Sequence, residues 1–353
     1  MIKNKKHIII VRSSTKGLSS LSEVSCNAIF EVLSNNFTRV EVNLVNNASD
    51  LNKIVANHPD LVFLGMEFVP TYTSLGIADP NKIWLSDVFD DIGIAYTGSS
   101  KNAHELGRNK PMAKQRILEM KLNTSAFYVI GQNNIGDIKD LPMNFPLFVK
   151  PANRGGGLGI DSYSVVHNFE ELHSKVCSIN IKLSSEALIE EYLPGREFSV
   201  AILKKEVSKE YIAMPIELIA PQDKFGSRIL SGQIKSANAE QAIAVSDPIT
   251  KNTIVRLALN VFNALGARDY GRIDIRLDVN GIPQFLEANL IPSLISGYGS
   301  FPKACLLNFG LNYESMILQI VNLGLSRNDS DYDGNILDSM NTFEVFNSKE
   351  MTF

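Results

Sequence analysis

The sequence predicts an α/β protein, and two observations carry this prediction. Over roughly the first hundred of its 353 residues, short apolar runs that suit buried parallel strands alternate with segments of helical periodicity. Further along, two apolar-rich runs at 270–278 and 282–288 flank Asn280-Gly281, which is the strongest short signal for a β-hairpin. A chain of this length has room for two or three domains with well-formed cores.

The composition narrows the class of protein. Hydrophobic residues make up 44% and charged residues 20% of the chain, as is typical of a globular protein. The net charge of −4 gives no reason to expect nucleic-acid binding. The three cysteines have no metal-binding spacing, and the apolar run at the N-terminus is too short for a signal peptide or a membrane span. We therefore expect a cytoplasmic protein with neither a nucleic-acid nor a membrane partner.

The first hundred residues contain the elements of an open α/β domain. Apolar runs predict strands at 7–11, 39–44 and 61–65, with a fourth strand at 94–97. Residues 21–34 have apolar side chains at helical spacing, which predicts a helix between the first two strands. No GxGxxG follows the first strand, so a dinucleotide site at that point is not supported.

Capping residues and apolar runs predict the remaining helices and strands. Asn109 is a good N-cap for a helix that begins at Lys110-Pro111, and Gly266 closes another. Further strands are predicted at 145–150 and 188–191, and further helices at 253–265 and 312–325. Residues 326–353 are expected to form a tail that is either loosely ordered or packed on the surface.

The predicted hairpin places four polar side chains on one face. With the Asn-Gly pair as the two loop residues, Asp274 faces Glu287 and Arg272 faces Asn289. The opposite face is apolar and suits the core: Ile273, Ile275, Leu286 and Ala288. Two opposed carboxylates repel unless a cation lies between them, and Mg²⁺ prefers carboxylate and amide oxygens. The polar face is therefore either a divalent-cation site or the solvated side of an ordinary hairpin.

A glycine-rich loop follows the strand that ends at Lys150. Gly155, Gly156 and Gly157 allow backbone N–H groups to approach phosphate oxygens closely, and the lysine adds positive charge. The loop is not a Walker A motif, because the lysine precedes the glycines. It is either a phosphate-binding loop or a mobile surface loop.

The segment LIEEYLPGREFSV places Glu190, Glu191 and Glu197 around a Pro-Gly turn. Backbone at 191–193 could pair with a purine edge, and a carboxylate could bind ribose hydroxyls. Acidic residues that flank a turn are also commonly just solvated, so this segment decides nothing by itself.

Taken in order, these segments resemble the ATP-grasp superfamily, and within it the D-alanine–D-alanine ligases. The matching segments run from about residue 7 to about residue 325: EVS at 23–25, YTGS at 96–99, NK at 109–110, FVKP at 148–151, LIEEYLPGREFSVAIL at 188–203 and GRIDIRLDVNG with LEAN at 271–289. The resemblance implies a Rossmann-like N-terminal α/β domain and two ATP-grasp subdomains that clamp ATP. We expect domains at 1–106, 107–187 and 188–325, and a tail at 326–353.

The resemblance also implies roles for individual residues. ATP phosphates would be bound by Lys110, Lys150 and the loop of Gly155, Gly156 and Gly157. Adenine would be bound by Glu190 and the backbone of Glu191, Tyr192 and Leu193, and ribose by Glu197. Asp274, Glu287 and Asn289 would hold Mg²⁺, with Mn²⁺ as the alternative metal.

Two arginines would serve catalysis. Arg272 would stabilise the charge on a reacting acyl phosphate. Arg228, in the segment 221–240 that would act as a lid, is the first choice for a further phosphate contact, with Lys224 and Lys235 as alternatives. Solvated surface charges explain these three lid residues equally well.

The sequence departs from the ligase pattern where substrates would bind. Leu21 stands where the family has a glutamate, Gly156 and Gly157 replace two serines, and the lid segment 221–240 contains no tyrosine. The segments 64–76 and 292–298 also differ from the family. The nucleotide half of the pattern is therefore retained, and the substrate half is changed.

These observations predict an ATP-dependent carboxylate–amine ligase that works through an acyl phosphate on small-molecule carboxylate and amine substrates. We expect amino acids or small peptides other than two D-alanines. One alternative is a divergent D-alanine–D-alanine ligase, and another is an inactive nucleotide-binding regulatory protein. A homodimer is common in the resembled family and is possible here.

Overall fold

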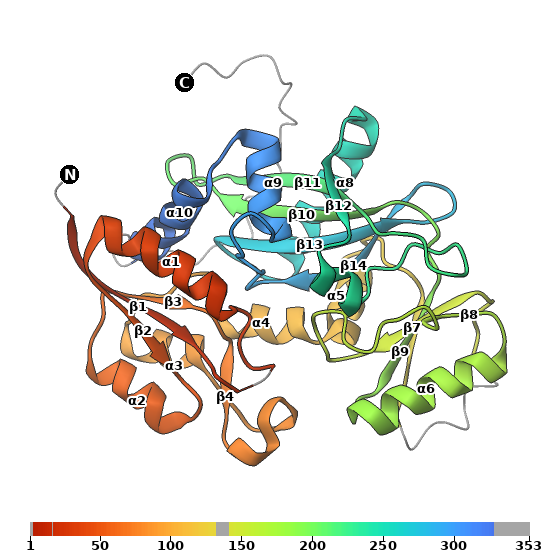
Figure 1. The fold of residues 1–353 in the computed structure, drawn as a ribbon, viewed down its shortest axis with the longest axis horizontal. Coiled ribbons are helices and arrows are strands. Elements are labelled where there is room, and N and C mark those ends of the chain that lie inside the picture. The colour runs from red at the N-terminus through yellow and green to blue at the C-terminus, as the bar shows by residue number, and fades with distance from the viewer. Residues whose placement is uncertain (1–2, 16, 132–140, 328–353) are drawn as a thin grey trace.

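The computed structural model describes residues 3–15, 17–131 and 141–327, and its fold is drawn in Figure 1. The mixture of helices and strands confirms the predicted α/β class. The predicted tail lies, beyond residue 327, outside the described residues. No helix in the described part of the chain is long and apolar enough to cross a membrane.

The N-terminal part is a three-stranded parallel sheet in the order β2-β1-β3. Ile8 and Ile10 of the central strand point into one core, and Ile9 and Val11 into another, as expected for a strand buried on both faces. The strands are β1 (Asn4–Arg12), β2 (Phe37–Leu44) and β3 (Leu61–Leu64). The helices are α1 (Glu23–Asn36) and α10 (Tyr313–Leu325) on one face, and α2 (Ala48–Ala56) and α3 (Leu85–Ile92) on the other.

The predicted fourth strand at 94–97 is wrong as a strand. Within the part of the chain that the structure describes, its only ladder contact is an isolated parallel bridge between Tyr96 and Val62. Gly93 and Gly98, both with positive φ, turn the chain on either side, so the extended stretch is too short for a full ladder. A small two-stranded sheet follows β3, formed by β4 (Phe68–Pro70) and β5 (Lys82–Trp84) around the 3₁₀ helix η1 (Thr73–Ala78).

The two sheets of the rest of the chain are antiparallel. The first has four strands in the order β6-β9-β7-β8, and the second has five in the order β12-β11-β10-β13-β14. The first consists of β6 (Phe127–Ile130), β7 (Leu147–Pro151), β8 (Val165–Val166) and β9 (Ala187–Glu191), packed against α6 (Phe169–Leu183). The second consists of β10 (Glu197–Lys204), β11 (Tyr211–Ile219), β12 (Gln241–Ala244), β13 (Tyr270–Leu277) and β14 (Pro283–Asn289), with α7 (Gly232–Ala237), α8 (Pro248–Ala264) and α9 (Ser300–Phe309).

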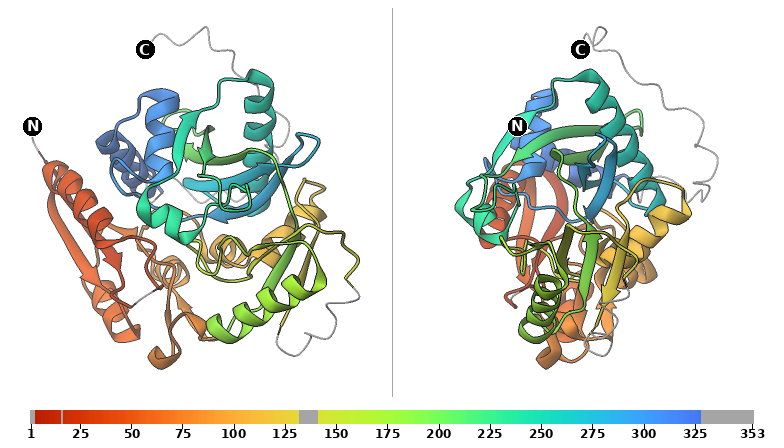
Figure 2. Two further views of the ribbon diagram at one scale, coloured as in Figure 1. Left: turned by 45° about the vertical axis from the view of Figure 1, so that its right-hand side comes forward. Right: turned by 90° about the vertical axis from the view of Figure 1, so that its right-hand side faces the viewer.

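Two consecutive helices join the three parts. In the views of Figures 1 and 2 the five-stranded sheet lies above the four-stranded one, and the N-terminal sheet lies to one side in Figure 1. Helices α4 (Lys101–Arg108) and α5 (Lys110–Glu119) contact β14 from below. The Asn109 side chain accepts a hydrogen bond from the Met112 N–H group, which confirms the predicted N-cap of α5.

The hairpin has the predicted partners but a different turn. Asp274 pairs with Glu287 and Arg272 with Asn289. Of the two predicted loop residues only Gly281 has positive φ, so the turn is not type I′. The Asp278 N–H group bonds the Ile282 carbonyl, and the Gly281 N–H group bonds the Asp278 carbonyl. These bonds define a three-residue loop with glycine in the left-handed position.

A bulge in β14 compensates for the longer loop. Between the pairs Asp274–Glu287 and Ile275–Phe285 the register shifts by one residue, which leaves Leu286 without a partner. Phe285 is fully buried and Leu286 only partly. The predicted core position of Leu286 is therefore wrong, and Phe285 takes its place.

The predicted domain division stays a prediction. Its boundary after residue 187 falls inside β9, whose hydrogen bonds are to β6 and β7. Its boundary after residue 106 falls inside α4. The change from the four-stranded to the five-stranded sheet comes after Glu191, where β9 ends.

Candidate nucleotide and metal site

The polar face of β13 is organised around Asp274. The Arg272 side chain donates to it in bidentate fashion, from Nε to Oδ1 and from Nη2 to Oδ2, both at 2.9 Å. The Ser199 hydroxyl donates to Oδ1 at 2.8 Å, and the Asn289 amide to Oδ2 at 3.3 Å. A bidentate, largely buried pair of this kind fixes both side chains. The sequence reasoning missed Ser199, which lies directly opposite Asp274 on the neighbouring strand β10.

Glu287 is surrounded by cationic side chains, and its strand partner Asp274 is neutralised by Arg272. Its Oε2 atom is 3.5 Å from the Lys110 ammonium. Burial would raise the pKa of Glu287, but the positive charges of Lys110, Lys150, Lys235 and Arg272 lower it far below its usual value. The carboxylate is therefore ionised at neutral pH. Burial also lowers the pKa of Lys110, whereas Glu287 raises it.

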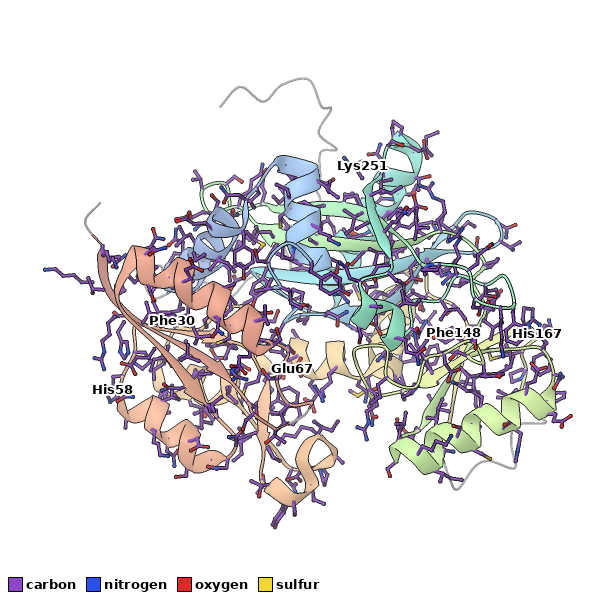
Figure 3. The ribbon with its side chains drawn as sticks, in the orientation of Figure 1. Phe30, His58, Glu67, Phe148, His167 and Lys251 are labelled. Atoms are coloured by element: carbon purple, nitrogen blue, oxygen red, sulfur yellow. The ribbon has the colours of Figure 1, made fainter. Side chains whose placement is uncertain are left out.

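Glu190 is held between two buried lysines. Its two oxygens lie 2.7 Å from the ammonium groups of Lys114 and Lys150. Burial would raise the pKa of Glu190, but these two charges lower it below 4.5. Glu190 lies in β9 opposite Phe148 of β7. Figure 3 labels Phe148 beneath the five-stranded sheet. The predicted adenine contact of Glu190 stays a prediction, and here the side chain is an ion-pair partner.

Lys114 is the main residue that the sequence reasoning missed. Its ammonium also donates to Thr124 Oγ1 at 2.6 Å and Ser125 Oγ at 3.0 Å. The signal was present, since Lys114 follows Lys110 by four residues on a predicted helix and so shares its face.

Glu197 lies at the edge of the same cluster. Arg276 donates to Glu197 Oε2 at 2.9 Å, and it shares the face of Arg272 and Asp274 by the period of two. Burial raises the pKa of Glu197 above its usual value; Arg276 and Lys235 oppose this rise, while Asp274 and Glu287 add to it.

The predicted adenine edge has one unused donor. The Glu191 N–H group bonds the Ala126 carbonyl, and the Tyr192 N–H group bonds the Pro146 carbonyl. Within the described residues, the Leu193 N–H group has no protein acceptor. A donor of this kind fits an acceptor nitrogen on the edge of a base.

The glycine-rich loop packs against the start of α7. Gly156 and Gly157 have positive φ, and a Cβ atom on Gly157 would lie 2.7 Å from the Gly232 backbone nitrogen. A side chain on Gly157 would therefore push the two backbones apart. The Lys110 ammonium donates to the Arg154 carbonyl at 2.6 Å, which fixes the start of the loop. Gly155 has no close neighbour at its Cβ position.

The three lid cations differ in what they face. Arg228 is exposed and donates to the carbonyl of Ala220, the residue before this segment. Lys224 donates to the Tyr163 hydroxyl at 2.8 Å. Lys235 acts electrostatically on both Glu197 and Glu287. Lys235 therefore influences both carboxylates, and the role of the first choice, Arg228, stays a prediction.

The cluster as a whole carries excess positive charge. Six cationic side chains surround four carboxylates, which leaves two net positive charges. The cations are Lys110, Lys114, Lys150, Lys235, Arg272 and Arg276, and the carboxylates are Glu190, Glu197, Asp274 and Glu287. Such a surplus of positive charge suits a polyanion such as a nucleoside triphosphate.

The donor set of the predicted metal site fits a hard cation. Asp274 and Glu287 supply carboxylates on paired strands, and Asn289 supplies an amide next to Asp274. Among the described residues, no three acidic, histidine or cysteine side chains form a metal-binding group; the predicted set contains only two. Asp274, Glu287 and Asn289 are the residues that would hold Mg²⁺.

The substrate side of the site differs in character. Leu21 is buried, and its side chain lies where a Cβ atom on Gly65 would meet it at 2.8 Å. An apolar contact therefore occupies this point. The segment 292–299 leads into Ser300, whose hydroxyl accepts from Arg272 Nη1 at 3.2 Å.

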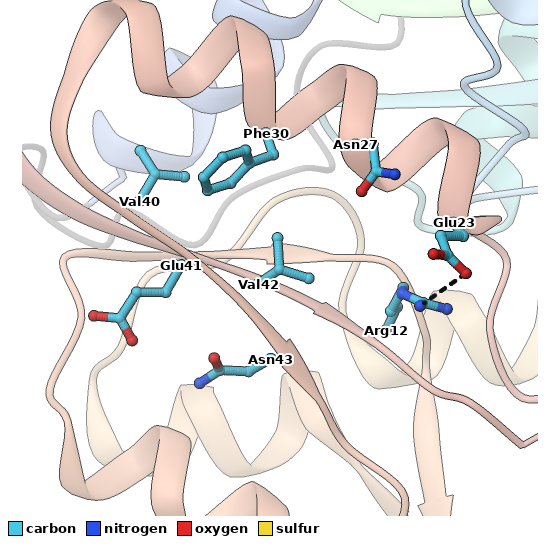
Figure 4. Close-up of a pocket in the computed structure, with 8 residues that line it drawn as sticks. All are labelled: Arg12, Glu23, Asn27, Phe30, Val40, Glu41, Val42 and Asn43. Atoms are coloured by element: carbon cyan, nitrogen blue, oxygen red, sulfur yellow. Dashed lines mark ion pairs between the residues drawn. The ribbon is translucent and has the colours of Figure 1, made fainter.

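A pocket elsewhere on the surface is separate from this cluster. Figure 4 shows it between α1 and β2, where the Arg12–Glu23 ion pair closes one end at 3.5 Å. None of its lining residues is a predicted site residue.

The comparisons with known proteins agree with the fold. A family model described as "D-ala D-ala ligase C-terminus" matches residues 120–322. The D-alanine–D-alanine ligase of Hydrogenovibrio crunogenus is 28% identical over 240 residues, which covers 67% of this chain and 72% of that protein. The D-alanine–D-alanine ligase of Alcanivorax borkumensis is 30% identical over 212 residues, which covers 60% and 63%. A protein of Sinorhizobium fredii named only as uncharacterized protein y4sG is 29% identical over 245 residues, which covers 67% and 68%.

A solved structure supports the fold over nearly the whole chain. The D-alanine–D-alanine ligase from Bacillus anthracis complexed with ATP superposes with a TM-score of 0.69 at 19% identity. The match covers 92% of this chain and 99% of that one, which confirms the ATP-grasp architecture. Because the family model spans more than half of the 353 residues, the protein belongs to the D-alanine–D-alanine ligase family and is an ATP-grasp ligase.

Proposed function

We propose that the protein activates a small carboxylate with ATP and joins it to an amine, and that D-alanine with D-alanine is the first pair to test. The expectation of other substrates has less support from the comparisons, because the relatives from Hydrogenovibrio crunogenus, Lacticaseibacillus casei and Alcanivorax borkumensis are all named D-alanine–D-alanine ligases. The observation that carries the proposal is the charged cluster that includes Arg272, in which six cationic side chains and four carboxylates leave two surplus positive charges.

The residues of the cluster divide the work by their charge. Lys110, Lys150 and Lys235 face the carboxylates and would neutralise phosphate oxygens. Arg272 would stabilise the charge that builds up on the carbonyl of an acyl phosphate while an amine attacks it. Mg²⁺, when bound, would draw negative charge from the phosphates and align them for transfer.

The assay measures ADP and amide together. We expect ADP release that depends on D-alanine and an equal amount of D-alanyl-D-alanine. A panel of other amino acids, offered as first or second substrate, tests the wider class. If MgATP raises the melting temperature but no pair on the panel gives an amide, the ligase proposal is wrong and the regulatory alternative gains support.

One observation favours a different first substrate. At Leu21 the structure has a buried apolar side chain packed at Gly65, so a substrate ammonium near this point would find no carboxylate there. Under this second proposal, a carboxylate without a free α-amine would be activated faster than D-alanine. Equal or slower turnover of such compounds would exclude it.

A further inference from the structure

Tyr298 connects the lid to the catalytic arginine. Its hydroxyl donates to the Lys235 carbonyl in α7, and Glu240 Oε1 lies 3.2 Å from the same oxygen. Two residues later, the Ser300 hydroxyl accepts from Arg272. The three residues 298–300 therefore contact both Lys235 and Arg272, which lie on different elements.

Helix α7 has little apolar packing against the described residues. None of its six residues is buried, so apolar packing does not hold it in place. Its N-terminus rests on the glycine-rich loop through the close backbone contact of Gly232 and Gly157. The phenol of Tyr298 is a side-chain anchor that reaches the backbone of α7 at Lys235.

We propose that Tyr298 is a positioning residue that holds Lys235 over the phosphate-binding side chains and keeps the lid closed during the reaction. The proposal rests on the proposed ligase function. With the anchor in place, the amine is the nucleophile that reaches the acyl phosphate. Without it, water attacks the acyl carbon, the bond from carbon to the phosphate oxygen breaks, and carboxylate and phosphate are released without an amide.

The test compares Tyr298→Phe with Tyr313→Phe. The Tyr313 hydroxyl, in α10, donates to the Leu294 carbonyl at 2.9 Å. The control therefore removes a tyrosine hydrogen bond to the loop that contains Tyr298, but no bond to α7. Each variant is digested with trypsin in the presence of Mg²⁺ and a non-hydrolysable ATP analogue. Cleavage after Lys224, Arg228 and Lys235 reports on the lid.

For Tyr298→Phe we expect cleavage at these sites to be roughly fivefold faster than in the wild type, as the loss of one ordinary hydrogen bond predicts. We also expect more ADP than amide at saturating acceptor. Tyr313→Phe should cleave like the wild type and keep the ratio of ADP to amide at one. An unchanged cleavage rate in Tyr298→Phe, or equal acceleration in both variants, would overturn the proposal.

The two readouts separate this inference from the proposed function. If the wild type forms no amide with any substrate, the ligase proposal fails, and the digestion still decides whether Tyr298 anchors the lid. Melting temperatures of both variants without nucleotide show whether either is globally destabilised. If the melting temperature falls in both variants and both are cleaved faster, the faster cleavage comes from loss of the fold, and the proposal is overturned.

Discussion

At the scale of single residues, the structure changes what the charges do. Two opposed carboxylates on a hairpin suggest repulsion, yet Asp274 is neutralised by Arg272 and Glu287 by several lysines. The cations and carboxylates pair with one another where phosphates and a metal would otherwise pair with them. Nucleotide binding would therefore replace ion pairs between side chains with ion pairs to the phosphates and the metal. The side chains are already charged in the unbound protein, so binding would not require any of them to become ionised in the interior.

This arrangement predicts that Glu287 stabilises the fold. Because cations lower its pKa far below the usual value, Glu287→Gln should destabilise the ligand-free protein and also abolish ligase activity. The matched control is Glu206→Gln, an exposed residue near α10, which should change neither. Urea unfolding and the ADP assay measure both effects. A more stable Glu287→Gln protein would show that repulsion with Asp274 dominates after all.

Lys114 should matter for stability as much as for binding. It is fully buried and pairs with Glu190, so Lys114→Met leaves that carboxylate with one cation. Removing one partner of a buried pair costs about 3–5 kcal/mol. Lys53→Met, which breaks an exposed pair with Asp50, should cost less than about 1 kcal/mol. Equal unfolding free energies for the two variants would contradict the buried-pair account.

Glu190 should also set part of the acid stability. Its folded pKa lies below the unfolded value of 4.5, so its contribution is complete above about pH 4.5 and is lost as the pH falls through the folded pKa. Between pH 6 and pH 3 the melting temperature of the wild type should therefore fall more steeply than that of Glu190→Gln. Parallel curves would show that Glu190 keeps its ordinary pKa in the folded state.

At the scale of elements, the sequence predicted partners better than it predicted backbone detail. The pairing of Asp274 with Glu287 follows from the strand period, and the structure confirms it. The turn and the bulge were not predictable from the strand period. The loop is one residue longer than predicted, and the extra residue Leu286 in β14 restores the register, so the predicted pairs stay the same. The ion pair of Glu190 with Lys114 was missed for another reason: it joins β9 to α5, and no local period relates residues on separate elements.

The bulge gives a direct test of the hairpin. Phe285 is fully buried in the core that includes Ile117 and Ile275, whereas Leu286 lies at the unpaired position. Phe285→Ala should destabilise the protein by about 3–5 kcal/mol, and Leu286→Ala by much less. Chemical denaturation of both variants measures the difference. The reverse order would restore the simple two-residue turn that the Asn-Gly sequence suggested.

At the scale of the whole molecule, one hydrophobic core contains side chains from both the N-terminal sheet and the five-stranded sheet. Side chains of the N-terminal sheet, such as Ile8 and Ile10, share a cluster with Met316 and Ile320 of α10 and with Leu203 of the five-stranded sheet. The last helix of the described chain therefore packs against β3 and α1 of the N-terminal part. In Figure 1, α10 lies beside α1, far from it in sequence. Such a shared core couples the part that holds Leu21 to the part that holds the phosphate cluster.

This shared core predicts a single unfolding transition that responds to nucleotide as a unit. A ligand that binds only the folded state adds about 2.7 kcal/mol at one hundred times its dissociation constant. MgATP should therefore shift one calorimetric peak to higher temperature, with the N-terminal sheet included. Ile320→Ala, which leaves the phosphate cluster untouched, should lower the melting temperature of that same peak. Two peaks, of which MgATP moves only one, would mean that the N-terminal sheet unfolds independently and that its contact with α10 is too weak to link substrate binding to phosphate chemistry.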